Sequence, residues 1–112
     1  MASPDELWLV DFGIPFPGEP GFHRPALVIG PPQSFGPTFP FVILCPLTTS
    51  HRGLSLHVEI DASEDSGLDE VSYVQCELLR SVNGQRLVHR LGVINVASSR
   101  EVTEILRTLL DH

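Results

Sequence analysis

Two groups of polar side chains stand at the edges of apolar segments and have types suited to binding an anion. Arg24 stands near the start of one apolar run, and Thr48, Thr49 and Ser50 stand at the end of the next. A guanidinium stays charged and can give two parallel hydrogen bonds to a phosphate or a carboxylate. Neither a charged group nor a run of hydroxyls is expected to point into an apolar core. These residues are therefore the candidate site.

The two apolar runs that carry these residues are predicted to be the central strands of a sheet. The runs His23 to Ile29 and Pro40 to Leu47 are short, rich in apolar and β-branched residues, and bounded by glycine and proline. Such runs are typical of strands that are buried on both faces. If the two strands are antiparallel, the start of the first lies beside the end of the second. We therefore expect Arg24 and Thr48 to meet on the rim of the core.

The remaining pattern predicts further strands and one helix. The run Leu54–Ile60 alternates strictly, which predicts that His57 and Glu59 face solvent. Ser98, three residues before Glu101, is typical of a capping box at the start of a helix. An apolar stripe at helical spacing follows. The other predicted strands are Leu7–Phe12, Val71–Leu79 and Leu87–Ile94, and the stripe consists of Val102, Ile105, Leu106, Leu109 and Leu110.

Together these elements predict one mainly β (α+β) domain over residues 1–112. Closely spaced strands with turn chemistry between them, followed by one helix, favour a small antiparallel barrel or half-barrel with the helix packed against it. The apolar content of the strands and of the helical stripe exceeds what a domain of this size readily covers, which favours a homodimer.

The loop from Gly13 to Phe22 is interrupted by prolines and glycines and cannot form a ladder or a helix. It carries two aromatic residues, Phe16 and Phe22. Aromatic residues on a loop either pack back onto the body of the domain or contact a ligand. A loop that lies over a ligand would satisfy both interpretations.

Charge and cysteine content exclude several functional classes. The formal net charge of −7 argues against a protein that coats nucleic acid through its overall field. Cys45 and Cys76 lie far apart in strand-like runs, so buried thiols are expected. The five histidines are scattered. We therefore predict no metal site and no cofactor.

No segment of the sequence is typical of a membrane protein or of a secreted one. The longest apolar run, Phe39 to Leu47, contains two prolines and is far shorter than the roughly 20 residues that span a bilayer. The first residues lack the basic flank and apolar segment of a signal peptide. We expect a cytoplasmic protein without membrane contact.

With these elements placed, the chain resembles the MazF/PemK (Kid) family of toxin endoribonucleases, which act on single-stranded RNA and are held inactive by an antitoxin. Order and spacing agree over nearly the whole chain, and the resemblance implies a compact, SH3-like antiparallel β-barrel that forms a homodimer. The segments that carry it are Leu7–Phe12, Gly18–Glu19, His23–Val28, Pro46–Thr49, His57–Glu59, Cys76–Val82 and the C-terminal helix.

The resemblance implies that Arg24 and Thr48 carry catalysis. Cleavage without a metal uses the 2′-hydroxyl of the RNA as nucleophile, so the protein must align it and stabilise the charge that builds on phosphorus. Arg24 would supply the positive charge and Thr48 a hydroxyl. The residues expected to bind RNA are Glu19, His23, Thr49, Ser50, Arg52 and Arg80, although stabilisation of the loop remains an equal alternative for Glu19 and His23.

The resemblance also implies an antitoxin, MazE-like, that binds through a disordered segment. The arginines at positions 80, 86 and 90 would attract its acidic residues. Two alternatives remain open at this stage. A CcdB-like toxin has the same fold and binds gyrase without chemistry of its own, but the last four residues of this chain contain no Phe, Tyr or Trp. The second alternative is an inactive relative that only binds an antitoxin.

Overall fold

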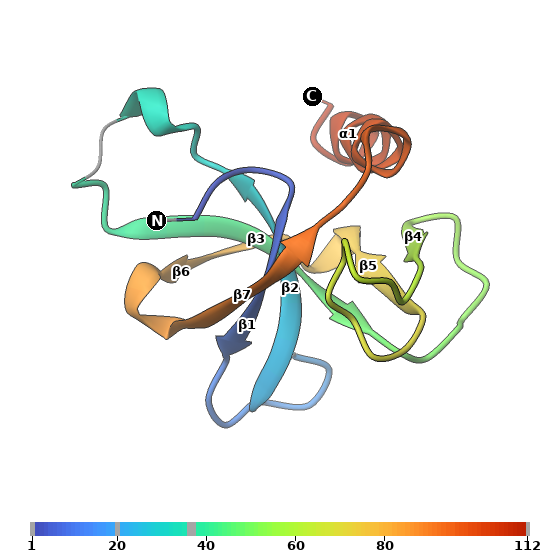
Figure 1. The fold of residues 1–112 in the computed structure, drawn as a ribbon, viewed down its shortest axis with the longest axis horizontal. Helices are drawn as coiled ribbons and strands as arrows, with labels where there is room; N and C mark the ends of the chain where they lie inside the picture. Colours follow the sequence, from blue (N-terminus) through green and yellow to red (C-terminus); the bar gives the residue numbers. More distant parts are fainter. Residues whose placement is uncertain (1, 20, 36–37, 112) are drawn as a thin grey trace.

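The computed structural model describes residues 2–19, 21–35 and 38–111. Strands dominate the chain, and its single α-helix lies at the C-terminal end (Figure 1). The elements are β1 (Glu6–Asp11), β2 (His23–Gly30), the 3₁₀ turn η1 (Gln33–Phe35), β3 (Phe41–Thr48), β4 (His57–Ile60), β5 (Ser72–Gln75), η2 (Cys76–Leu78), β6 (Arg80–Asn83), η3 (Gly84–Arg86), β7 (Leu87–Val93) and α1 (Val96–Leu109).

All strand pairs are antiparallel and belong to one sheet, in the order β4-β5-β3-β2-β1-β7. β3 has β2 on one side and shares its other side between β5 and β6. The predicted mainly β fold with one C-terminal helix is confirmed. The predicted barrel is not confirmed. A closed barrel requires the two end strands of the sheet to pair, and no pairing between β4 and β7 is present among the described residues. The sheet is curled but open (Figure 1).

The predicted central position of the two apolar runs is confirmed. β2 and β3 pair antiparallel, and Leu27 lies opposite Cys45. Both cysteines are buried free thiols, as the sequence indicated. Strands without alternation are therefore buried on both faces, because the curled sheet has a core on each side.

Two apolar clusters form these cores. The larger lies between the sheet and α1, and the smaller lies on the opposite face of β2, next to the strand ends that carry Arg24 and Thr48. The larger contains Leu7, Leu27, Cys45, Leu47, Val58, Ile60, Leu68, Val74, Cys76, Ile94, Val102 and Leu106, and the smaller contains Val10, Phe12, Ala26, Leu44 and Val82.

The helix begins three residues earlier than the capping-box prediction. Asn95 is the N-cap, and its Oδ1 accepts a hydrogen bond of 2.8 Å from the Ser98 amide. Asparagine caps a helix as effectively as serine. Here the Asn95 side chain accepts from the Ser98 amide, which in the predicted capping box would have donated to the Glu101 side chain. Val102 and Leu106 of the predicted stripe are buried, whereas Leu109 is exposed.

The prediction for Leu54–Ile60 was wrong in three respects. Only His57–Ile60 forms a strand, because its partner β5 offers four residues, from Gln75 opposite His57 to Ser72 opposite Ile60. Leu54 is exposed instead of inward-facing. The side chain of His57, predicted to face solvent, is only 3% exposed because it is covered by Glu77.

The predicted strand Val71–Leu79 is divided. η2 follows β5 directly and turns the chain, so that Arg80 begins a separate strand, β6, against the first half of β3. β6 leads into η3, whose N-cap is Asn83, and Asn83 Oδ1 accepts a hydrogen bond of 2.8 Å from the Gln85 amide. Over the described residues, no helix has the length and apolarity needed to cross a membrane.

Candidate functional site

Arg24 and Thr48 lie level with each other at one end of the β2–β3 pair. Ala26 is opposite Pro46, and continuing this antiparallel register by two residues places Arg24 opposite Thr48, with both side chains on the same face. Both residues are half-buried. The register therefore brings the two residues to the same end of the sheet, as the sequence predicted for antiparallel strands.

A buried amide joins this pair from β5. Arg24 Nη1 donates a hydrogen bond of 3.4 Å to Gln75 Oε1. Gln75 is only 5% exposed, so its carbonyl oxygen has few alternatives to this partner. Sequence reasoning missed Gln75, because a glutamine within an apolar run carries no signal until β5 is known to pair with the end of β3.

The Thr48 hydroxyl is oriented by its own loop. Thr48 Oγ1 accepts a hydrogen bond of 3.2 Å from the Ser50 amide. Because a hydroxyl has one donor and two acceptor sites, this contact leaves the O–H available to donate. Thr48 could thus donate to an oxygen of a bound phosphate.

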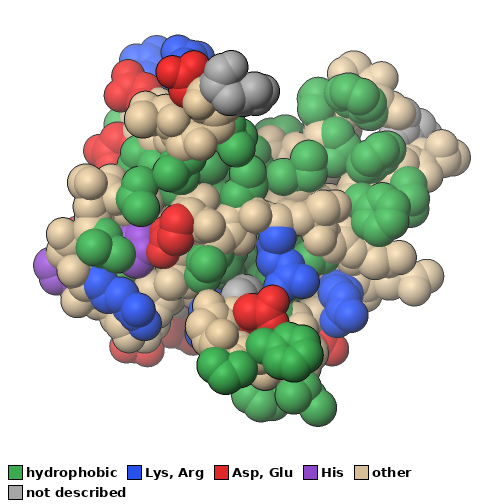
Figure 2. All heavy atoms as spheres, turned by 180° about the vertical axis from the view of Figure 1, so that it is seen from behind, with side chains coloured by type: hydrophobic (Ala, Val, Ile, Leu, Met, Phe, Trp, Pro, Cys, Tyr) green, Lys and Arg blue, Asp and Glu red, His purple; other side chains and the backbone are tan. Residues whose placement is uncertain are grey.

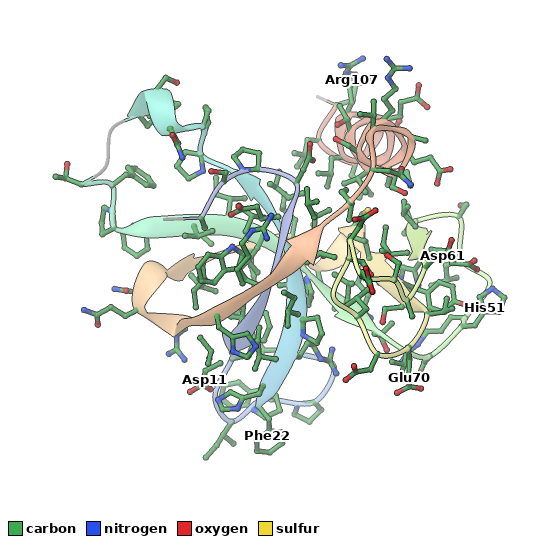
Figure 3. All side chains as sticks on the ribbon, viewed as in Figure 1. Asp11, Phe22, His51, Asp61, Glu70 and Arg107 are labelled. Atoms are coloured by element: carbon green, nitrogen blue, oxygen red, sulfur yellow. The ribbon has the colours of Figure 1, made fainter. Side chains whose placement is uncertain are left out.

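Thr49, Ser50 and Arg52 lie on the exposed loop that leaves β3 beside Thr48. The loop is anchored where the His51 ring packs on Tyr73, at 5.0 Å between ring centroids. Tyr73 lies opposite Thr48 in the β3–β5 pair, so its aromatic side chain shares the face of the candidate site. Figure 3 shows His51 at the outer edge of this loop.

Arg80 reaches the same face from β6. It lies opposite Leu44, which shares a face with Ala26 and Arg24 through the β2–β3 register. Its guanidinium carbon stands 5.6 Å from the centroid of the Phe12 ring, a distance at which cation–π attraction holds the charge in place. The site face therefore carries at least two arginines.

Glu19 and His23 are not drawn into this group. Glu19 Oε1 accepts a hydrogen bond of 3.0 Å from the Phe16 amide and closes the β1–β2 loop. His23 lies opposite Asp11, one residue out of phase with Arg24, so alternation directs it to the other face. Its Nε2 is 3.8 Å from Asp11 Oδ2. Pro20 of this loop lies outside the described residues.

The other two arginines expected to attract an antitoxin have partners of their own. Arg90 Nε is 2.9 Å from Glu6 Oε2, and Arg86 Nη1 donates a hydrogen bond of 3.2 Å to the Asp11 carbonyl. Arginine side chains are nevertheless visible on more than one part of the face in Figure 2. Basic charge is thus distributed along the sheet and does not form one continuous patch.

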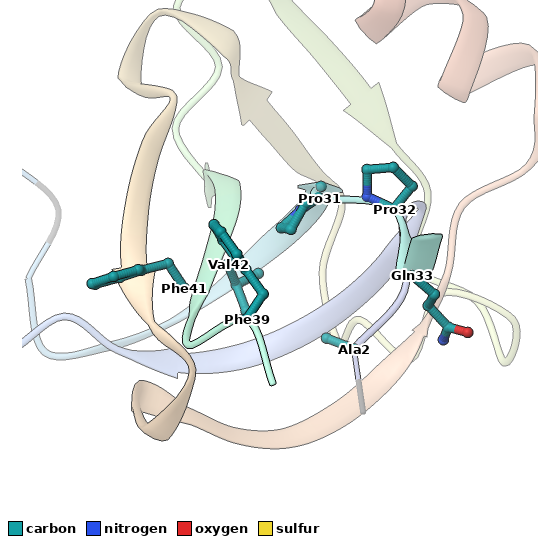
Figure 4. Close-up of a pocket in the computed structure, with 8 residues that line it drawn as sticks. Ala2, Pro31, Pro32, Gln33, Phe39, Phe41 and Val42 are labelled. Atoms are coloured by element: carbon teal, nitrogen blue, oxygen red, sulfur yellow. The ribbon is translucent and has the colours of Figure 1, made fainter. Parts of the chain in front are cut away.

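A pocket at the opposite end of the β2–β3 pair does not compete with this site (Figure 4). None of its side chains has a titratable group or a nucleophile, so it offers no acid–base chemistry. Its lining residues are Ala2, Gly30, Pro31, Pro32, Gln33, Phe39, Phe41 and Val42. Elsewhere among the described residues, no three of His, Cys, Asp and Glu are grouped closely enough to hold a metal ion.

Comparisons with known proteins concern the family and the fold of the chain. Residues 4–110 match the family model described as the PemK-like, MazF-like toxin of type II toxin-antitoxin systems. Among solved structures, MazF from Deinococcus radiodurans is 25% identical with a TM-score of 0.84, covering 99% of this chain and 97% of that chain.

Two further solved structures show the same fold at lower identity. The Mycobacterium tuberculosis toxin MazF-mt6 is 22% identical with a TM-score of 0.78, covering 95% of this chain and 96% of that chain. An endoribonuclease from a mycobacterial species, solved in complex with its cognate antitoxin, is 18% identical with a TM-score of 0.78, covering 98% and 95%.

Proposed function

Because this chain belongs to the PemK-like, MazF-like toxins of type II toxin-antitoxin systems, we propose that it inhibits growth by cleaving single-stranded RNA. The observation that supports the proposal is the pairing of Ala26 with Pro46, because the same register continued by two residues sets Arg24 opposite Thr48 on one face of the sheet. The description of a mycobacterial structural neighbour as an endoribonuclease supports it.

In the proposed reaction, the 2′-hydroxyl of the RNA attacks the adjacent phosphorus, and the bond from phosphorus to the 5′-oxygen of the next nucleotide breaks. The products are a 2′,3′-cyclic phosphate and a 5′-hydroxyl. Charge on the non-bridging oxygens increases as phosphorus becomes pentacoordinate. Catalysis by the protein therefore consists of positioning the phosphate and stabilising this charge, for which no metal or cofactor is required.

Arg24 would supply the main stabilisation, through two hydrogen bonds from its guanidinium to the phosphoryl oxygens. Gln75 Oε1 occupies one N–H direction of this guanidinium and leaves other N–H groups for the phosphate. The Thr48 O–H would donate to the same phosphate. Arg80, held on Phe12, would bind a neighbouring phosphate of the strand.

We further propose that an antitoxin with a disordered segment inhibits the toxin by crossing the rim at Arg24 and Thr48. An acidic side chain there would occupy the guanidinium that the scissile phosphate needs. MazE–MazF complexes are known from Deinococcus radiodurans, which supports a partner of this kind. If a bound antitoxin left Arg24 fully accessible to solvent, this account of inhibition would be incorrect.

The proposed activity is tested by incubating the purified protein with a long, weakly structured RNA and mapping the ends of the fragments. We expect cuts at a limited set of sequences, products with a 2′,3′-cyclic phosphate and a 5′-hydroxyl, and unchanged rates in EDTA. Cleavage that depends on added magnesium would contradict the mechanism. Absence of cleavage, together with inhibition of DNA gyrase, would support the binding toxin instead.

A further inference from the structure

One aromatic ring next to the candidate site is exposed on a strained backbone. Phe22 has a φ of +55°, in the left-handed region that bulky side chains rarely adopt. Phe22 is also 67% exposed, so packing against the domain does not compensate the strain. Figure 3 places it at the end of the sheet, beyond the strands β1 and β2. Strain that persists without a packing benefit is typical of functional positions.

Two backbone hydrogen bonds hold Phe22 in this conformation. Its amide donates to the Gly13 carbonyl at 2.6 Å, and its carbonyl accepts from the Phe12 amide at 2.8 Å. They join the two ends of the β1–β2 loop immediately before β2 begins. The main chain that carries the ring is therefore fixed by the fold before any ligand binds.

Phe22 lies in the chain immediately before the strand that carries the phosphate-binding group of the proposed reaction. Arg24 follows Phe22 by two residues, so that the Cα atoms of the two residues are about 7 Å apart where the intervening chain is extended. Two other apolar side chains of the loop, Ile14 and Phe16, are also exposed. Figure 2 shows hydrophobic side chains gathered at the lower edge of the molecule in that view. An exposed ring thus stands two residues before the arginine that would hold the phosphate, so a base next to that phosphate is the nearest apolar group of the RNA that it could contact.

We propose that Phe22 stacks on a base of the RNA next to the phosphate held by Arg24. The inference rests on the proposed function and adds a binding contact to it. Every base presents a flat π-face to an aromatic ring, so the contact would add affinity for unpaired RNA without choosing the base sequence. Because the backbone at Phe22 is already held by two hydrogen bonds, only the torsions of its side chain need to be ordered on binding.

The test compares variants of Phe22 with a matched variant of Phe35. Phe35 is also 67% exposed but lies in η1, after the far end of β2. The probe is a fluorescein-labelled 12-nucleotide RNA with 2′-O-methyl riboses, whose sequence is taken from a cut site mapped with the unmodified protein. A second version carries 2-aminopurine beside the cut position, because the fluorescence of this base falls when it is stacked.

Phe22→Ala should weaken binding of the probe by about 5- to 100-fold, the range found for one base–aromatic stack. It should also abolish the fall in 2-aminopurine fluorescence. Phe22→Trp should retain both. Phe22→Gly should lose affinity like Phe22→Ala but unfold at a higher urea concentration, because glycine adopts this φ without strain. Phe35→Ala should bind as the unmodified protein does.

Normal binding and quenching by Phe22→Ala, with RNA cleavage intact in the unmodified protein, would overturn this inference and leave the proposed function standing. An equal loss of affinity in Phe35→Ala would overturn it as well. An unmodified protein that neither cleaves nor binds RNA would overturn both. Retained RNA affinity with weakened antitoxin binding in Phe22→Ala would assign the ring to the antitoxin and reject the stack.

Discussion

The hydrogen bond of 3.4 Å from Arg24 Nη1 to Gln75 Oε1 joins the rim of the site to the buried end of β5. A guanidinium on a flexible stem loses side-chain entropy when it is fixed. The hydrogen bond to Gln75 restricts the Arg24 side chain already in the folded protein, so part of this entropy is lost on folding and not on binding RNA. If Arg24 binds the scissile phosphate as proposed, Gln75 is a positioning residue that acts through Arg24.

Gln75→Leu should lower kcat for RNA cleavage by about 10-fold, at the lower end of the effect of a hydrogen bond to a charged group. KM should change little, because Arg24 keeps its charge. Cleavage rates measured over a range of RNA concentrations separate the two constants. Gln85→Leu, at an exposed position in η3, is the matched control and should cleave normally. A Gln75→Leu protein with normal kcat would remove the positioning role.

Arg24→Ala should reduce the rate of RNA cleavage by about 100- to 1000-fold, as expected for loss of one transition-state donor. Thr48→Ala should reduce it comparably or somewhat less. The fold should persist in both, because neither residue is fully buried. Circular dichroism with a cleavage assay distinguishes loss of activity from loss of structure. Arg100→Ala, at an exposed position of α1, is the control, and normal cleavage by Arg24→Ala would contradict the assignment.

A homodimer is predicted from apolar surface that the single chain leaves uncovered. An open cleft between α1 and the sheet is lined by Ile29, Ile43, Leu79 and Leu106, and a second cleft extends to the exposed Leu109. Sedimentation at micromolar concentration should show a dimer. Leu109→Glu should shift it to a monomer, whereas Val96→Glu, at the first and exposed residue of α1, should not. A monomeric unmodified protein would contradict the prediction.

The sequence predicted which strands lie at the centre of the sheet, and therefore which end of the sheet carries Arg24 and Thr48. Arg24 and Thr48 flank the two most apolar runs, and such runs leave little choice other than adjacent central strands. Gln75 could not be found in this way, because its position depends on where β5 ends and η2 begins. The local sequence pattern does not show where β5 ends, because that end is set by the turn of the chain through η2 into β6.

His57 illustrates the same limit. Strict alternation assigned it to a solvent-facing side, but alternation defines only which side chains share a face. Whether that face meets water depends on Glu77, twenty residues away, whose Oε2 lies 2.9 Å from His57 Nε2. The open sheet likewise depends on β3 sharing one edge between two strands, which no local pattern shows.

Replacing Glu77 and replacing His57 should lower the free energy of unfolding by different amounts, although both changes remove the same contact. His57 Nδ1 is buried and has no hydrogen-bond partner among the described residues, so Glu77→Leu would leave both ring nitrogens unsatisfied. We expect this variant to lose about 2–3 kcal/mol of unfolding free energy. His57→Leu should lose about 1 kcal/mol, because the Glu77 carboxylate remains partly in water.

Urea unfolding of the two single variants and the double variant measures this difference, and the double variant should cost less than the sum of the two. Glu59→Leu is the control, since Glu59 lies on the same strand and is exposed. Equal costs for the two single changes would show that the Nδ1 atom is satisfied by water in solution.

The stability of the fold should depend on pH through Glu6. Burial alone would raise the pKa of this carboxyl, but hydrogen bonds from Trp8 Nε1 at 3.1 Å and the Ser3 amide at 2.8 Å, with Arg90 Nε at 2.9 Å, hold the pKa below its ordinary value of 4.5. The folded state therefore binds this proton more weakly than the unfolded state does. The resulting stabilisation is fully present above the ordinary pKa and is lost as the pH falls through the lowered native pKa.

Glu6→Gln keeps the shape and one acceptor oxygen but removes the charge. Its unfolding free energy should be lower than that of the unmodified protein at pH 7, and the difference should shrink as the pH falls below 4.5 and the Glu6 carboxylate takes up its proton. Urea unfolding at intervals between pH 7 and pH 3 measures this convergence. Glu101→Gln, at an exposed position of α1, should run parallel to the unmodified protein throughout. A difference for Glu6→Gln that stays constant over this range would mean that its cause is lost packing and not the carboxylate charge.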